Sequence, residues 1–220
     1  MKRNEEHAVA PLLQEYFVPA GFGEAEFVEK KSRFIGRVWL TETEEKALAH
    51  LAAMRERHWD ATHNVYAYSI RGGQTRYSDD GEPQGTSGMP TLNVFRHEGI
   101  CNVCCVITRY FGGTLLGAGG LVRAYSKAAK MALDAAGVSV MRQWEVLLIS
   151  CEYAFFERVK ALVATHEGIV ESADFAVDVM IEALIPSQRA ELFIKNITDM
   201  SAGTIVPERM DATFRAARVR

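Results

Sequence analysis

Three carboxylates lie close together in one stretch of the sequence, residues 78–90, which also holds several glycines and prolines. Asp79, Asp80 and Glu82 could together bind a divalent cation or act as a general acid and base, with His63 as a further acid. Asp side chains also accept hydrogen bonds from nearby amides in glycine-rich turns, and this capping is their commoner use. The residue types therefore favour a structural role for the three acids.

A second stretch could bind an anion. Over residues 109–123 a hydrophobic strand runs into a glycine-rich turn and then into a helix. Glycine tolerates positive φ, and the first amides of a helix are unpaired donors at the positive end of its dipole. A phosphate or another anion could therefore bind at this turn. Its glycines are Gly112, Gly113, Gly117, Gly119 and Gly120.

Two phosphate-binding fingerprints do not match the turn. Gly112 and Gly117 have the outer spacing of a P-loop, but Ala118 and Gly119 stand where Lys and Ser or Thr must contact phosphate and Mg²⁺. A dinucleotide fingerprint also fails, because Val122 occupies the third small position and no βαβ unit with a strand-end acidic residue is evident. Neither a Walker-type nor a Rossmann site is predicted, and no cofactor is expected.

Basic residues occur on the helix after the turn and in an earlier segment. Arg123, Lys127 and Lys130 fall at i, i+4 and i+7, so they share one helical face. Residues 30–37 form the most basic local patch. Exposure of a helix face or a charged sheet edge would explain both features, and so would an anionic partner. The candidate residues for contacts with an anion or a nucleic acid are the glycines of the turn and Lys30, Lys31, Arg33, Arg71, Arg76, Arg109, Arg123 and Lys127.

Composition limits the function classes. The 220-residue chain is 48% hydrophobic and carries a net charge of −3, so any nucleic-acid contact must be local and no DNA specificity is expected. No apolar run resembles a membrane span or a signal peptide, which favours a cytoplasmic protein without a membrane partner. Cys101, Cys104 and Cys105 share one predicted strand, where alternating side chains cannot converge, so no metal site is predicted.

The hydrophobic patterns predict two domains of an α+β protein. In the first, strands are expected near residues 25–28, 33–40, 61–70, 74–78 and 103–108. Three helices are expected there: one begins at a capping box over 41–44, a second ends near Phe95 and a third ends at Ala136. Residues 145–206 show the order βαββαβ of a ferredoxin-like domain, with a last strand at 203–206. The predicted boundaries are an N-terminal arm (1–20), a first domain (21–137), a linker (138–143), the ferredoxin-like domain (144–207) and a loose basic tail (208–220).

Three segments together, residues 61–64, 78–90 and 109–125, resemble the IMPACT/YigZ family, and residues 31–35 are similar to its N-terminal element. The resemblance covers roughly residues 16–206 and points to the bacterial two-domain branch. One departure is Ser87, where the family usually has alanine. The residues that carry the motifs are His63, Asn64, Asp79, Asp80, Gly81, Glu82, Pro83, Gly85, Thr86, Gly88, Pro90, Arg109, Tyr110 and Phe111.

The resemblance implies a fold and a field of function. The first domain is expected to have the ribosomal-protein domain-2-like α/β fold, and the second to be similar to the fifth domain of elongation factor G. Eukaryotic members of the family regulate translation. The resemblance therefore implies a noncatalytic, translation-associated protein that binds RNA, the ribosome or a translation-regulatory protein. The alternative is an enzyme on a phosphorylated or nucleotide substrate, with the glycine turn as phosphate cradle and His63, Asp79, Asp80 and Glu82 as its catalytic residues.

Overall fold

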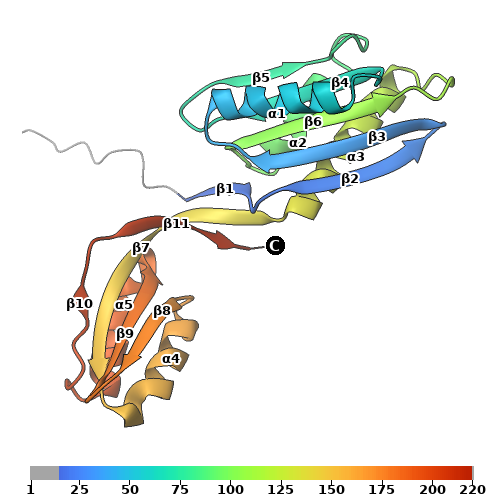
Figure 1. Ribbon diagram of the computed structural model, residues 1–220. Coiled ribbons are helices and arrows are strands. Elements are labelled where there is room, and N and C mark those ends of the chain that lie inside the picture. Colours follow the sequence, from blue (N-terminus) through green and yellow to red (C-terminus); the bar gives the residue numbers. More distant parts are fainter. Residues whose placement is uncertain (1–14, 220) are drawn as a thin grey trace, which may run out of the picture. The chain divides into compact units, whose positions relative to one another are not determined.

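The computed structural model describes residues 15–219 of the chain and divides them into two units (Figure 1). One unit contains residues 16–140 together with the last residues of the chain, and the other contains residues 141–215. The helix expected near residues 11–15 and most of the predicted N-terminal arm lie outside the described residues. The arm's last part, Tyr16–Pro19, forms strand β1, which pairs with β7 (Val138–Cys151).

The first unit contains a five-stranded sheet of order β2-β3-β6-β4-β5, in which every neighbouring pair is antiparallel. These strands follow the expected apolar segments closely, because each has β-branched or aromatic residues bounded by glycine or charged turns. Their bounds are β2 (Gly23–Glu29), β3 (Ser32–Leu40), β4 (His63–Ser69), β5 (Thr75–Ser78) and β6 (Val103–Tyr110).

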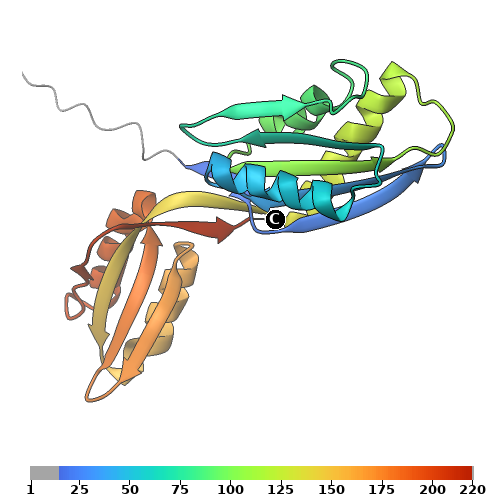
Figure 2. The same cartoon turned by 45° about the horizontal axis from the view of Figure 1, so that its top comes forward.

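Helices cover both faces of this sheet, which makes the central strand β6 apolar on both sides (Figure 2). Helix α1 (Glu44–Arg57) packs on one face, where Cys104 and Val106 meet its apolar residues. Helices α2 (Gly88–His97) and α3 (Ala118–Ala136) pack on the other, where Cys105 and Ile107 join the larger core. The prediction that Cys104 and Cys105 point to opposite faces is confirmed, but Cys101 precedes the strand instead of belonging to it.

The ends of the helices show where the local signals were correct. Helix α3 ends at Gly137, which has φ 72° and donates to the carbonyl of Leu133, as a glycine stop predicts. Helix α1 begins two residues later than the capping box suggested. Its N-cap is Thr43, whose hydroxyl accepts from the backbone N of Lys46, whereas Thr41 is buried and donates to the carbonyl of Trp39.

The second unit has the ferredoxin-like order βαββαβ, as predicted. In its sheet β9 lies between β7 and β8, and β10 and β11 both pair with β7. One core of buried side chains, including Leu147, Ile181 and Phe193, lies between this sheet and its helices. The remaining elements are η2 (Tyr153–Phe155), α4 (Phe156–Thr165), β8 (Ile169–Phe175), β9 (Val179–Pro186), α5 (Ser187–Met200), β10 (Glu208–Arg209) and β11 (Thr213–Arg218).

Two segments differ from the expectation. Residues 138–143, expected as a linker, begin strand β7, and its first three residues, Val138, Ser139 and Val140, are all buried. Residues 203–206 are not a strand, and the last strands are β10 and β11 in the segment expected to be a loose basic tail. Ile205 explains the mistaken strand at 203–206, because it is an apolar residue whose side chain fills the core from a turn held by Ser201.

Candidate functional site

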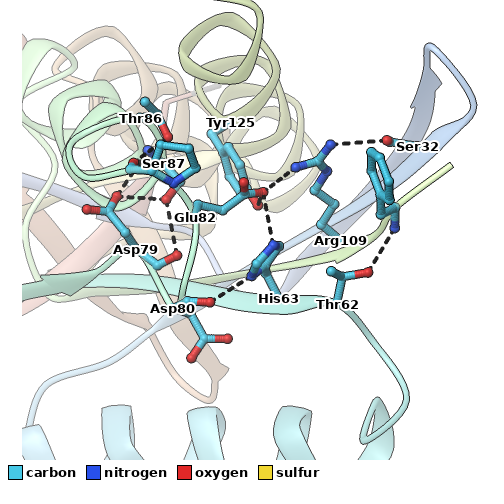
Figure 3. A network of polar contacts seen from close by, with 12 residues as sticks. Ser32, Thr62, His63, Asp79, Asp80, Glu82, Thr86, Ser87, Arg109 and Tyr125 are labelled. Atoms are coloured by element: carbon cyan, nitrogen blue, oxygen red, sulfur yellow. Dashed lines mark hydrogen bonds and ion pairs between the residues drawn. The ribbon is translucent and has the colours of Figure 1, made fainter. Parts of the chain in front are cut away.

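Asp79 organises the acidic loop between β5 and α2. Its carboxylate accepts hydrogen bonds from the backbone N of Gly85 at 2.8 Å, Ser87 at 3.1 Å and Gly88 at 2.8 Å, and from the Ser87 hydroxyl at 2.7 Å (Figure 3). Burial alone would raise the pKa of this carboxyl, but the hydrogen bonds outweigh it and lower the pKa below its ordinary value. Asp79 therefore caps the start of α2, and its carboxylate is occupied by four hydrogen bonds from the loop.

Asp80 joins the same loop to strand β4. Its residue has φ 45°, and its carboxylate accepts from the backbone N of Asn64 at 2.7 Å and from Arg55 at 2.9 Å. Its carbonyl oxygen lies 2.7 Å from Nδ1 of His63 (Figure 3). A carbonyl only accepts, so Nδ1 carries the proton and Nε2 of the neutral imidazole holds a lone pair.

Glu82 forms a buried ion pair with Arg109. Its Oε1 lies 2.5 Å from Nη1 of Arg109 and accepts from the Tyr125 hydroxyl at 2.7 Å, while Nε2 of His63 lies 3.8 Å away (Figure 3). Burial, and then the charge of Glu82, raises the pKa of Tyr125 well above its ordinary value, so the phenol stays protonated and donates. Nε of Arg109 has no hydrogen-bond partner among the described residues.

The same network fixes the glycine turn. Nη2 of Arg109 donates to the Ser32 hydroxyl at 3.2 Å, and that oxygen also accepts from the backbone N of Gly112 at 3.2 Å. A Cβ on Gly112 would lie 2.1 Å from the backbone C and O of Lys31, so only glycine fits there. Gly117, with φ 73°, is the N-cap of α3 and provides no side-chain cap. The β2–β3 turn and the glycine turn therefore meet at one end of the sheet (Figure 1).

Two cavities flank the glycine turn, and Leu116 lines both. The first, here called the cationic pocket, has a volume of about 240 Å³, and the second, the His63 pocket, about 360 Å³. The cationic pocket is lined by Phe27, Glu29, Lys30, Leu116, Gly120, Arg123, Ala124 and Lys127. The His63 pocket is lined by Thr62, His63, Gly81, Glu82, Pro83, Arg109, Phe111, Leu115, Leu116, Gly117, Ala118 and Leu121.

The cations of the cationic pocket have no acidic partner among the described residues. Lys30, Arg123 and Lys127 are exposed and make no ion pair, and the ammonium of Lys127 lies 4.3 Å above the Phe27 ring. Lys31, next to them in the turn, is also exposed. Cations elsewhere on this unit are mostly ion paired, namely Arg33, Arg37, Lys46, Arg55, Arg76, Arg109 and Lys130.

The other cations proposed from the sequence lie elsewhere or are already bound. Arg33 pairs with Glu26 at 2.6 Å, and Arg109 is buried against Glu82, so it offers no surface charge. Arg71 follows strand β4, whose register with β6 puts it at the end of the sheet opposite the glycine turn, and its guanidinium lies 3.8 Å above the Tyr16 ring. Arg76, opposite Tyr68, pairs with Glu44. The structure therefore gathers only Lys30, Lys31, Arg123 and Lys127.

The family-motif residues divide between support and lining. Several of them form hydrogen bonds within the acidic loop and strand β4, or begin helix α2; these are Asn64, Gly85, Thr86, Gly88 and Pro90. Tyr110 and Phe111, adjacent in sequence, separate in space. The Tyr110 hydroxyl contacts His58 and Asp60, whereas Phe111 lines the His63 pocket.

Sequence reasoning did not single out Phe27, Thr62, Leu115 or Leu116. Leu115 is 82% exposed and Phe111 is 44% exposed, although both are large and apolar. The available signal was a pair of leucines inside a glycine-rich turn, where small or polar residues are usual. Thr62 accepts from the backbone N of Phe111 at 3.0 Å and so holds the start of the turn.

Two further searches of the described residues were negative. No group of three or more His, Cys, Asp or Glu side chains in that part of the chain is arranged to hold a metal ion. No helix within it has both the length and the apolar character needed to cross a membrane.

Family models match most of the chain. The Impact N-terminal domain matches residues 30–133, and a domain of unknown function, DUF1949, matches residues 149–204. The first match contains the acidic loop, the glycine turn and helix α3 as far as residue 133, and so includes Lys30, Arg123 and Lys127. The second falls within the ferredoxin-like unit.

Full-length relatives are similar over nearly their whole length. The IMPACT family member YvyE of Bacillus subtilis is 32% identical, over 87% of this chain and 89% of its own. YigZ of Escherichia coli is 33% identical over 80% and 88%, and the IMPACT family member in the pol 5′ region of Thermus thermophilus is 37% identical over 80% and 97%. A crystal structure of a hypothetical protein superposes with a TM-score of 0.57 at 30% identity, over 91% of this chain and 99% of that one.

Proposed function

Because the chain belongs to the IMPACT family, we propose that it is a noncatalytic, translation-associated protein that binds RNA phosphates in the cationic pocket. The single observation that carries the proposal is the set of unpaired cations there. Lys30, Arg123 and Lys127 line one cavity with a single carboxylate, Glu29, so the pocket keeps an excess of positive charge on a protein whose net charge is −3.

The surroundings of these cations suit a phosphate. The helix α3 starts at Ala118, so the backbone N–H groups of its first turn lack intrahelical acceptors and lie at the positive end of the helix dipole. Gly120, in that turn, lines the pocket and allows close approach. Arg123 projects back over the same turn, since its Nη1 would lie 3.6 Å from a Cβ on Gly119. A backbone phosphate would therefore meet side-chain charge and helix dipole together.

The competing proposal, an enzyme acting on a phosphorylated or nucleotide substrate, has less support. The carboxylates of Asp79 and Asp80 are occupied by backbone amides and Arg55, and that of Glu82 by Arg109 and Tyr125. An acid or base that holds a loop together cannot exchange protons with a substrate without opening that loop.

Binding of a labelled single-stranded RNA of mixed sequence, followed by fluorescence anisotropy at graded salt, tests the proposal. Three phosphate contacts predict a slope of log affinity against log salt of about −2, which is a loss of about fifteenfold between 50 and 200 mM. The variant Lys30→Gln/Arg123→Gln/Lys127→Gln should bind weakly and lose nearly all of this slope.

The matched control removes three exposed cations from other places, in the variant Arg76→Gln/Lys160→Gln/Lys195→Gln. It has the same net charge as the test variant, so a pocket-specific effect must leave its affinity close to that of the unmodified protein. Salt-independent binding, or equal losses in the two triple variants, would refute the proposal. Binding to a translation-regulatory protein instead of RNA would appear as capture that the pocket variant does not weaken.

A further inference from the structure

The His63 pocket lies on the other side of the glycine turn from the cationic pocket, and the proposed function does not use it. Its volume of about 360 Å³ falls within the range of small-ligand sites. Resting on the proposed function, we propose that this pocket receives one unpaired base of the bound RNA, and that His63 selects bases that present an amino group.

One wall of the pocket is apolar and accessible. Phe111, Leu115, Leu116 and Pro83 line it, and Leu115 exposes 82% of its surface. A large apolar side chain held open in a fixed turn gains free energy when a flat ligand covers it. Unpaired bases have two such faces and stack on aromatic side chains of RNA-binding proteins. The exposed wall therefore fits the faces of a base.

The opposite side of the pocket presents acceptors. Because Nδ1 of His63 donates to the carbonyl of Asp80, Nε2 holds a lone pair whenever the ring is neutral. No hydrogen bond to Nε2 is formed by the described residues, and the nearest acidic oxygen, Oε1 of Glu82, is 3.8 Å away and is itself an acceptor. A ligand edge that faces Nε2 of His63 must therefore donate.

This requirement distinguishes the bases. Cytosine presents an amino donor at the position where uracil presents a carbonyl acceptor. A carbonyl facing Nε2 of His63 and the Glu82 carboxylate would set acceptors against one another, whereas an amino group would donate to the histidine. One such bond is worth roughly a fivefold difference in affinity.

The position of Leu116 connects the base to the phosphate. Leu116 lines both cavities, so the two cavities adjoin at the turn of residues 112–117. An RNA strand that lies over this turn can place a phosphate against Lys30, Arg123 and Lys127 and insert a base into the His63 pocket. The charge of the first pocket thus argues for a nucleic-acid occupant of the second.

The test compares three RNA ligands of equal length: oligocytidylate, oligouridylate and an abasic ribose–phosphate strand. We expect the cytidine strand to bind at least about fivefold more tightly than the uridine strand, and the abasic strand to bind most weakly. Leu115→Ser should weaken cytidine binding about fivefold or more and leave the abasic strand unaffected. The control Leu192→Ser alters an exposed leucine of α5 and should change neither.

The variant His63→Phe keeps a ring but removes the acceptor, so the ratio of cytidine to uridine affinity should fall to about one, with folding checked by circular dichroism. A structural role of His63 alone would lower both affinities and keep their ratio. With the salt slope and the effect of the cation triple variant retained, equal binding of the cytidine and abasic strands overturns the base pocket. Equal binding of the cytidine and uridine strands overturns selection by His63, and either result leaves the proposed function standing. Absence of binding by all three strands overturns both.

Discussion

The buried ion pair between Glu82 and Arg109 makes a strong prediction about stability. Both side chains are almost fully buried, and their N and O atoms are 2.5 Å apart. The substitution Glu82→Gln preserves shape but leaves the guanidinium without a counter-charge. Removing one partner of a buried pair costs about 3–5 kcal/mol. We expect the lower end, about 3 kcal/mol, because the amide oxygen can still accept one hydrogen bond.

For a chain of this size, that loss lowers the unfolding temperature of the first unit by about 6–12 °C. The matched control is Glu26→Gln, which also removes the acid of an arginine ion pair, with Arg33 at 2.6 Å, but on the exposed surface. It should leave the midpoint nearly unchanged because exposed pairs contribute little. Thermal unfolding followed by circular dichroism gives both midpoints.

A double variant separates charge from shape. Glu82→Leu/Arg109→Met removes both charges together, and replacing a buried pair by apolar residues of similar volume is often neutral. Part of the stability lost in Glu82→Gln should therefore return. If Glu82→Gln costs no more than Glu26→Gln, the acidic loop is not anchored by this pair and the structural reading of its acids fails.

Three further predictions concern the acidic loop and the glycine turn. The folded pKa of Asp79 lies below its ordinary 3.8, so its contribution is present above that value and is lost as the pH falls through the folded pKa. Asp79→Asn should therefore flatten the fall of the urea midpoint below about pH 5. Gly112→Ala should cost about 1–3 kcal/mol or more by pushing the Lys31 backbone away. Gly113→Ala faces open space and keeps only its φ strain, about 1–2 kcal/mol by thermal unfolding.

Much of the fold could be predicted from the sequence because the hydrophobic periodicity and the glycine and turn signals at the ends of the elements agreed. Strand β6 is covered on both faces, so its unbroken apolar run was informative, and Gly137 stopped α3 where a glycine C′ residue should. The final strands were missed because β10 and β11 carry polar and basic residues and owe their position to pairing with β7. Local composition does not report such long-range pairing.

The candidate site was predictable in its loops but not in its charges. The glycine turn and the acidic loop stood out by residue type, yet nothing in the sequence says which cations are paired. In the sequence Arg109 and Lys30 are both simply basic residues, but Arg109 is buried against Glu82 and Lys30 lines an open pocket. Which cations form ion pairs depends on the register of the strands. On β6, Arg109 lies opposite His63 of β4 on one side and opposite Phe34 of β3 on the other.

The structural role of the acids bears directly on how the two pockets would bind. The turn that separates them is held at Gly112 by Ser32, which Arg109 orients, and Arg109 is in turn fixed by Glu82. A turn held in this way loses little conformational entropy when RNA binds, so its affinity for RNA is larger than that of a loose loop. Variants of Glu82 should therefore weaken RNA binding because they displace the turn. Their affinity for cytidine, uridine and abasic strands should fall alike. His63→Phe should change the ratio between bases instead, and this difference separates the frame of the site from its selective group.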